Sequence, residues 1–468
     1  MIKSKLIKKI AVVAMAAFMG ACVLGGGTSE AGSIYPGMGK KPPTSWKKPT
    51  TPENKPSTAS KPAQSTKDNR ATWKKADSAN TVLRVGLASG VVKAAISSVN
   101  GMHILGATDN RDYGDFRSNI VANLSVQGKA IVVNGKNSGA SSLIFAPVTT
   151  SAGGKIKFNT NEYRGQIMVS VDGGQLLVVN LISLEDYVKG VLPSEMSPSW
   201  NMEALKAQAV AARTYALYTK NQKTHLGDGY DLCDSTHCQA YDGISGEASA
   251  ASAAVDATKG LVMTYQGRPI YAPYHASSGG ITENSEDVWG NKLPYLRSVK
   301  DDDTKSPYHN WSVKYTAGQV QKLLSAAGKN IGQLKSIAMT TSNSRATSLQ
   351  FIGSGQTVTL TSQQARQIFG LKSSYFTIRA QRQAAVKPIE LPKPQNTNQK
   401  VVDQAPVAMQ DRNIKVENDK VEIIFDGHGF GHGLGMSQYG AKAMADAGRK
   451  YEDILHHYYT DIEIVQWH

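Results

Sequence analysis

The chain has 468 residues, of which 40% are hydrophobic and 19% charged, and its formal net charge is +15. That length suggests two or three domains with a sizeable core. The first 80 residues carry 14 Lys and Arg against 4 Asp and Glu, whereas the rest of the chain carries 38 against 33. The positive charge therefore lies mainly ahead of the folded part. Together with the lack of a nucleic-acid motif, this distribution argues against binding of DNA or RNA.

The N-terminus has the features of an export signal. A basic start, MIKSKLIKKI, precedes an apolar run that is too short to span a bilayer. Two cleavage sites compete: MGAC, which ends at Cys22, resembles a bacterial lipobox, and SEA, which ends at Ala31, fits ordinary signal peptidase. We favour the lipobox, which would make Cys22 a lipid anchor. We expect the signal region over 1–31, which contains both sites, and an exported protein of the cell envelope, tethered at most to the outer face of the membrane.

Two regions of different composition follow the signal. Residues 32–80 are rich in Pro, Lys, Ser and Thr, which predicts a disordered spacer. Its basic charge suits anionic envelope polymers or lipid head groups, and a plain soluble linker is equally compatible. Residues 81–176 alternate β-rich runs with Gly, Asn and Asp turns and predict a β-rich N-terminal part. Near its end, VDGGQ predicts a hairpin between strands Gln166–Val171 and Gln175–Ile182.

The region 177–310 opens with LEDYVKGVLPSEMSPSWNMEALKAQAVAARTYALYTK. An apolar strand is expected to end at Glu185 and Asp186, after which Pro and Ser residues predict a turn that holds Glu195. Asn201 is a suitable N-cap for the long Ala-rich helix that follows. A carboxyl beside apolar residues is either an ordinary surface group or an acid–base catalyst whose pKa the surroundings raise.

The rest of the chain completes an α+β fold. We expect an inserted β/α packet over 311–385, a linker over 386–415, and the C-terminal part of the core over 416–468. The predicted helices cover Gly246–Thr258, Thr316–Ala327, Ser362–Phe369 and Ala441–Ala447, and the predicted strands cover Leu261–Tyr265, Pro269–Tyr274, Leu334–Thr340, Ser348–Gly353 and Lys420–Phe425.

A group of thiols and imidazoles follows the long helix. His225, Cys233, His237 and Cys238 offer the soft ligands that tetrahedral zinc prefers. The spacing is not that of a standard zinc finger, because two of the ligands are adjacent. In an exported protein the two cysteines can instead form a disulfide, so spacing alone leaves a structural zinc ion and a disulfide open.

Other motifs mainly exclude functions. GHGFGHGLGMSQYG lacks the Lys and the spacing of a nucleotide-binding loop, and its glycines suit close backbone packing, with His432 as a sharper candidate for a site. His275 and Ser277 have no G-x-S-x-G elbow around them, which argues against a serine hydrolase. Glu195 has no second carboxylate nearby in the sequence, so a one-carboxylate mechanism fits better than a two-carboxylate glycosidase.

At LEDYVKGVLPSEM, LKAQAVAARTYAL, YHASSGGIT and GHGLGMSQYGA, the chain resembles the stage II sporulation protein D family. The four blocks occur in the family's order, which makes the resemblance specific. It implies a lytic transglycosylase that acts on peptidoglycan glycan strands already stripped of stem peptides by a cell-wall amidase. It also implies that Glu195 is the catalytic acid, that Arg213 is an essential arginine, and that the Cys/His segment binds zinc rather than forming a disulfide.

The implied reaction needs one carboxyl group. Glu195 would protonate the glycosidic oxygen between MurNAc and GlcNAc, and its carboxylate would then deprotonate the MurNAc 6-hydroxyl to close a 1,6-anhydro ring. Arg213 would orient Glu195 or hold a sugar substituent. The alternative function is a non-catalytic wall-binding enhancer of an amidase, and a zinc-stabilised adhesin fits the motifs less well. Further candidates for substrate binding are Tyr308, His432, Ser437 and Gln438.

Overall fold

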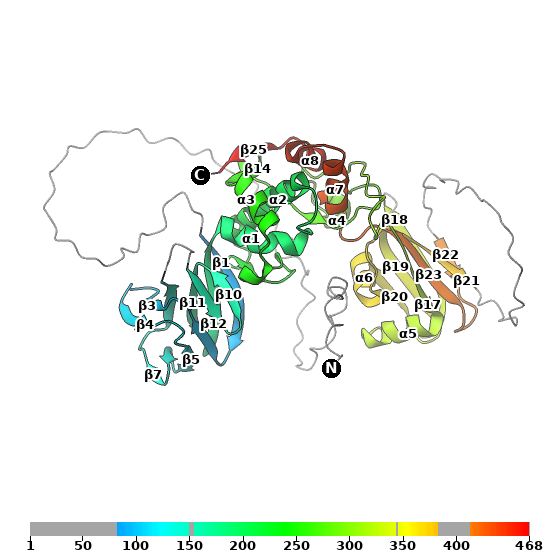
Figure 1. Cartoon of the computed structure of the whole chain (residues 1–468). Helices are drawn as coiled ribbons and strands as arrows, with labels where there is room; N and C mark the ends of the chain where they lie inside the picture. The colour runs from blue at the N-terminus through cyan, green and yellow to red at the C-terminus, as the bar shows by residue number, and fades with distance from the viewer. Residues whose placement is uncertain (1–81, 149–153, 343–344, 382–411, 468) are drawn as a thin grey trace, which may run out of the picture. The chain divides into compact units, whose positions relative to one another are not determined.

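The computed structural model describes residues 82–148, 154–342, 345–381 and 412–467. The expected signal peptide, the lipobox at Cys22, the basic spacer and most of the expected linker lie outside these residues. The described chain contains both helices and sheets, and its first helix follows a run of strands, which confirms the α+β class (Figure 1).

The N-terminal part consists of two antiparallel sheets. A short parallel strand extends one of them at its edge. Its strands are β1 (Val82–Val91), β2 (Ala94–Ser97), β3 (Met102–Gly106), β4 (Asp112–Phe116), β5 (Ala122–Gln127), β6 (Ala130–Val133), β7 (Lys136–Asn137), β8 (Ser142–Pro147), β9 (Lys155–Phe158), β10 (Asn161–Arg164), β11 (Gln166–Asp172) and β12 (Gln175–Ser183). One sheet has the order β1-β12-β11-β8-β3-β4, and β13 (Leu232–Cys233) extends it beyond β1. The other has the order β10-β9-β2-β5-β6-β7.

The expected hairpin at VDGGQ is present. β11 and β12 pair in register up to Asp172 and Gln175, so Gly173 and Gly174 form a two-residue turn. Both glycines have positive φ angles, 55° and 80°, which is the conformation that a tight hairpin of this twist requires.

The middle and the end of the chain form a helical core with short strands. Helices α7 and α8, drawn in red in Figure 1, pack against α2, drawn in green, although they lie far apart in the sequence. The helices are α1 (Leu184–Glu195), α2 (Met202–Gln222), α3 (Ser249–Ala257), α4 (Ser285–Trp289), α7 (Gln438–Asp446) and α8 (Tyr451–Tyr458), and the strands are β14 (Leu261–Tyr265), β15 (Arg268–Pro269), β16 (Tyr274–His275), β24 (Met436–Ser437) and β25 (Glu463–Gln466).

Helix α1 replaces the expected strand end and turn. The hydroxyl of Ser183 accepts a hydrogen bond from the backbone N–H of Asp186, which caps the helix. Glu185 and Asp186 then lie in the first turn, where acidic residues favour the positive end of the helix. Pro193 is tolerated because the helix ends two residues later, at Glu195, so little of the hydrogen-bond ladder is lost.

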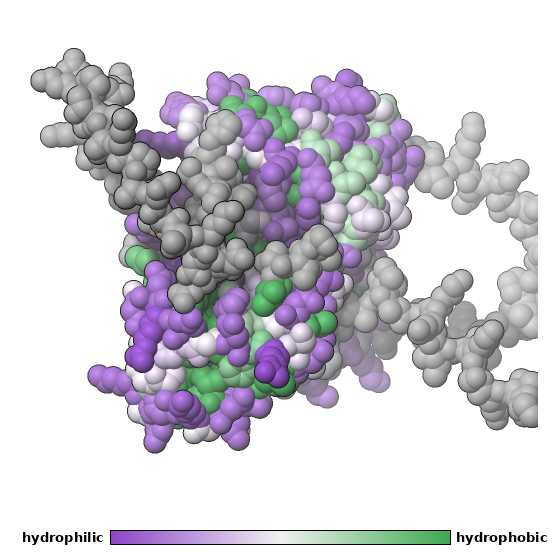
Figure 2. Space-filling view, turned by 60° about the vertical axis from the view of Figure 1, so that its left-hand side comes forward, coloured by the Kyte–Doolittle hydropathy of each residue, from purple (hydrophilic) through white to green (hydrophobic). Residues whose placement is uncertain are grey.

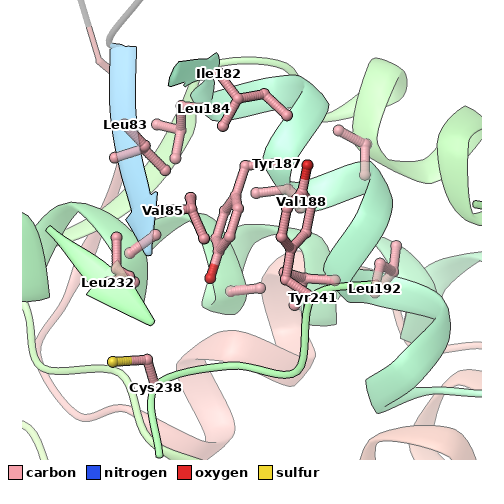
Figure 3. Packing of buried hydrophobic residues seen from close by; sticks show 14 of the residues in the cluster. Leu83, Val85, Ile182, Leu184, Tyr187, Val188, Leu192, Leu232, Cys238 and Tyr241 are labelled. Atoms are coloured by element: carbon pink, nitrogen blue, oxygen red, sulfur yellow. The ribbon is translucent and has the colours of Figure 1, made fainter. Parts of the chain in front are cut away.

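The long helix α2 begins as expected, and it forms the centre of the core. The side chain of Asn201 accepts a hydrogen bond from the N–H of Glu203 at 2.9 Å, which makes it the N-cap. The alanines of α2 are small, so α1, α3, α7 and α8 can all approach it. Figure 3 shows the adjoining layer, in which Tyr187 and Val188 of α1 lie beside Val85 of β1.

The packet has a hydrophobic core of its own and is larger than expected. Strand β22 pairs with β18, and strand β23 pairs with both β17 and β21. The packet therefore includes residues that were expected in the linker and in the C-terminal part, and it extends to His428. Its elements are β17 (Asn310–Thr316), α5 (Ala317–Ala326), β18 (Leu334–Ser342), β19 (Arg345–Gly353), β20 (Thr357–Thr361), α6 (Ser362–Phe369), β21 (Phe376–Gln381), β22 (Arg412–Lys415) and β23 (Glu422–His428).

The surface is mixed in polarity. Exposed large hydrophobic residues include Val92, Ile120 and Leu226. On the face that Figure 2 shows, hydrophobic residues form separate patches among hydrophilic ones. Among the helices of the described residues, none combines the length and the apolar character that crossing a membrane requires.

Candidate active site

Glu195 is a partly buried acid at the C-terminal end of α1. Burial disfavours the ionised carboxylate and raises its pKa to about 7. Hydrogen bonds from Tyr274 and Gln438 favour the carboxylate and partly offset that rise. The bond from Gln438 is long, with 3.5 Å between Nε2 and Oε2. Glu195 therefore changes protonation near neutral pH, which suits a group that must both give and take a proton.

Three segments that are distant in the sequence meet at this acid. Strand β16 pairs in parallel with β24, so Tyr274 lies opposite Met436 and His275 opposite Ser437. Helix α7 starts directly after β24, which places Gln438 beside Glu195. The YHASSGG and GHGLGMSQYGA blocks thus supply Tyr274 and Gln438, the two side chains that donate hydrogen bonds to Glu195 of the PSEM block.

Arg213 does not contact Glu195 in the structure. Its side chain is fully buried and makes a bidentate ion pair with Glu185, at 2.9 and 2.8 Å. It also donates to the backbone carbonyls of Leu261 at 3.0 Å and Val255 at 3.3 Å. Glu185 lies in the first turn of the helix that Glu195 ends, so Arg213 holds α1 in place. Of the two roles expected for Arg213, orienting Glu195 fits a buried guanidinium with these partners, and holding a sugar substituent does not.

The four expected substrate-binding residues divide into two pairs. Gln438 contacts Glu195, and Tyr308 is partly exposed. Ser437, by contrast, is fully buried and caps α7 by accepting from the N–H of Gly440 at 3.2 Å. His432 packs against His275 and Trp289 with ring centroids 5.4 and 5.3 Å apart, and burial lowers its pKa to about 3. Ser437 therefore supports the backbone at the start of α7, and His432 supports the Gly-rich loop by accepting from the N–H of Leu434 at 3.0 Å.

Tyr308 belongs to a row of partly exposed aromatic side chains that sequence reasoning missed. We call Trp200, Tyr439, Tyr308 and Phe430 the aromatic row. Their neighbouring ring centroids are 4.9, 6.0 and 5.0 Å apart in that order. Trp200 follows the PSEM block closely and Tyr439 is next to Gln438, so the row starts near Glu195. Its members come from three stretches of the chain, around Trp200, around Tyr308 and over 430–439, so no single sequence motif could have suggested the row.

The Cys/His residues form one compact cluster. Single donor atoms from His225, Cys233, His237 and Cys238 all lie within 4.8 Å of one another. His225 Nε2 is 3.2 Å from Cys238 Sγ, and His237 Nδ1 is 3.4 Å from Cys233 Sγ and 3.8 Å from Cys238 Sγ. Both cysteines are free thiols, so the disulfide alternative is not formed.

This donor set fits a four-coordinate zinc ion. Ligand atoms at about 2.0–2.3 Å from one ion in a tetrahedral arrangement are roughly 3.3–3.8 Å apart, close to the distances observed. His225 Nδ1 lies 2.8 Å from a carboxylate oxygen of Asp228, an outer contact that turns Nε2 toward the thiols. Four protein donors leave no open position, which is the pattern of a structural site.

Comparison with known proteins connects these features to a family. A family model described as stage II sporulation protein matches residues 172–265. An uncharacterized protein of Brachyspira hyodysenteriae is 32% identical over 314 residues, which covers 66% of this chain and 74% of that protein. The amidase enhancer of Bacillus subtilis is 33% identical over 299 residues, which covers 60% of this chain but only 40% of that protein. The stage II sporulation protein D of Bacillus subtilis is 32% identical over 307 residues, which covers 61% of this chain and 75% of that protein. The chain therefore belongs to the stage II sporulation protein D family, as its four sequence blocks had indicated.

Proposed function

We propose that this protein is a lytic transglycosylase of peptidoglycan in which Glu195 is the single general acid and base. The family membership supports a role on the cell wall. The observation that carries the catalytic proposal is the partly buried carboxyl with a pKa of about 7. In the described part of the chain, its interacting neighbours are Tyr274, Gln438 and Tyr215, none of which is a second carboxylate.

The reaction follows from this arrangement. Near neutral pH a substantial fraction of Glu195 is protonated and donates its proton to the oxygen that leaves with GlcNAc. As the bond from that oxygen to C1 of MurNAc breaks, the new carboxylate is stabilised by its two donors. It then accepts the proton of the MurNAc 6-hydroxyl, whose oxygen bonds to C1. The proton returns to Glu195, no water is consumed, and a 1,6-anhydro end is formed.

The aromatic row supplies a surface for the glycan strand. Sugar rings present C–H groups on their faces, and aromatic rings bind such faces through apolar contact. The rings follow one another in the order Trp200, Tyr439, Tyr308 and Phe430. A strand without stem peptides would expose its sugar faces to these rings, which agrees with a substrate first processed by an amidase.

The proposal includes a structural zinc ion at the Cys/His cluster. His225, Cys233, His237 and Cys238 would hold it. When bound, the ion would cross-link the loop between α2 and α3 and would take no part in proton transfer. The proposal also includes export to the cell envelope through the N-terminal signal, with Cys22 as a lipid anchor.

A second candidate function is favoured by one comparison. A relative that is 33% identical is named amidase enhancer. A wall-binding enhancer would need the aromatic row but not the ionisable group of Glu195. The two functions therefore differ in their dependence on that one side chain.

The deciding experiment uses peptidoglycan predigested with an amidase, with the purified protein and its Glu195→Gln variant side by side. Products are read by mass spectrometry for 1,6-anhydro-MurNAc ends. We expect the wild-type protein to form them and the variant to lose at least about a thousandfold in rate, because Gln cannot donate a proton. If neither protein forms them and both accelerate an added amidase equally, the chain is an enhancer.

A further inference from the structure

A chain of buried and partly buried hydrogen bonds joins the Cys/His loop to Glu195. Gln239 directly follows the cluster residue Cys238 and is 2% exposed. Its Nε2 lies 3.0 Å from the hydroxyl oxygen of Tyr274, which in turn bonds to Glu195. Its Oε1 accepts from the hydroxyl of Tyr187 at 3.2 Å. Neither Gln239 nor Tyr274 nor Tyr187 was identified by the sequence motifs as a site residue.

The direction of these hydrogen bonds is fixed by a backbone group. Gln239 Nε2 is 3.3 Å from the carbonyl oxygen of Ala212, which can only accept. The amide nitrogen must therefore face Ala212 and Tyr274, and the amide oxygen must face Tyr187. Because the amide donates to the hydroxyl oxygen of Tyr274, the hydroxyl proton of Tyr274 is left to donate to Glu195.

We infer that Gln239 is a positioning residue for Glu195, which acts by holding the Tyr274 hydroxyl as a donor to the carboxyl group. Its consequence for catalysis rests on the proposed function, whereas the hydrogen-bond chain does not. A donor held toward the carboxyl stabilises the ionised form and keeps its pKa from rising as far as burial alone would raise it. The loop that carries the Cys/His cluster thus also sets the protonation of the acid.

The other groups around Glu195 do not titrate in the same range. Tyr274 on β16 and Tyr187 on α1 have pKa values raised well above 10 by burial, and burial also raises that of Tyr215 on α2. Gln438 on α7 is a neutral amide. Among these described neighbours, Glu195 alone changes charge near neutral pH, so its titration can be measured without interference.

The test is a titration of Glu195 in protein labelled with ¹³C at the Glu side-chain carboxyl, with the resonance assigned through Glu195→Gln. Gln239→Glu replaces the donor by an acceptor that draws the Tyr274 proton away. We expect it to raise the Glu195 pKa by about one pH unit. Gln239→Met keeps the length, removes the donor and should raise the pKa by a smaller amount.

Tyr274→Phe supplies the matched control, because it removes the hydroxyl that links the two residues. In that background the neutral variant Gln239→Met should leave the Glu195 pKa unchanged, whereas the added charge of Gln239→Glu acts through space in both backgrounds. Equal shifts of Gln239→Met with and without the Tyr274 hydroxyl, or no shift in either, would overturn the inference. If Gln239→Glu fails to fold, Gln239→Met in the two backgrounds decides the question alone.

The titration needs no substrate, so it separates this inference from the proposed function. If the wild-type protein forms no anhydro ends but shows the expected pKa pattern, the catalytic proposal is rejected and the positioning role stands. If it forms anhydro ends but shows no coupling between Gln239 and Tyr274, the positioning role is rejected and the catalytic proposal stands.

Discussion

Glu195 combines a catalytic requirement with a cost to stability. An unfolded chain would ionise this carboxyl at about pH 4.3, whereas the folded chain does so at about 7. Between these values the folded state binds more protons than the unfolded state, so its stability falls as the pH rises. The loss of stability reaches its full size above the folded-state pKa, where the folded protein must hold the charged carboxylate in a partly apolar site.

Glu195→Gln should therefore stabilise the protein in a pH-dependent way. We expect it to raise the free energy of unfolding by about 2 kcal/mol at pH 8, a value reduced from the full linkage for partial exposure, and to have little effect at pH 4. Denaturant unfolding at the two pH values measures this difference. Glu463→Gln, which removes an exposed carboxyl on β25, is the control and should show no such dependence. Equal effects of Glu195→Gln at both pH values would contradict the assignment of a raised pKa.

At the scale of elements, the site depends on the placement of α1. The buried Arg213 and the partly buried Glu185 form an ion pair in the first turn of this helix, and the N–H of Gly260 donates to the same carboxylate at 3.0 Å. The helix is rigid, so a contact in its first turn fixes the position of its last residue. We therefore expect Arg213 to affect Glu195 without contacting it.

Arg213→Ala should destabilise the protein by about 3 kcal/mol, because it empties a fully buried site and leaves the partly buried Glu185 carboxylate without its partner. Arg379→Ala is the matched control, since its pair with Asp426 is exposed and should contribute only about 0–1 kcal/mol. Thermal unfolding of both variants provides the comparison. An Arg213→Ala protein with wild-type stability but no activity would instead indicate a direct role in the reaction.

The elements that could be predicted from sequence are those with local signals. Asn201 as an N-cap and the Gly173–Gly174 turn depend on residues a few positions apart, and both were correct. Helix α1 was missed because Pro193 and the nearby serines are turn signals that a helix C-terminus can also tolerate. The partners of Arg213 and Gln239 are contributed by other elements, so no spacing rule could have identified them.

At the scale of the molecule, the loop between α2 and α3 joins the β-rich part to the helical core. Its strand β13 pairs with β1, and Asp231 forms an ion pair with Arg84 at 2.8 Å. Tyr241 donates to the side chain of Asn180 on β12 at 2.9 Å. The Cys/His cluster lies between these contacts, so the order of this loop affects both parts of the protein.

Removal of zinc should therefore loosen both parts together. We expect roughly one zinc ion per chain by elemental analysis, and a fall in Tm of at least ~10 °C after chelation. Hydrogen exchange should rise in β1 as well as in the loop. Cys238→Ser should reproduce these effects, and Cys22→Ser should leave the zinc content unchanged. If the protein as purified contains no zinc and its Tm does not change with a chelator, the zinc site is excluded.

The route of the chain also sets when the site can exist. Gln438 contacts Glu195 from 243 positions further along the sequence. Strand β25, which pairs with β14, is formed by nearly the last residues of the chain. Because chains are synthesised from the N-terminus, a nascent chain that has not yet reached Gln438 carries its acid without one of the two donors to that acid. The surroundings that tune the protonation of Glu195 therefore form only after the segment that contains Gln438 has been made.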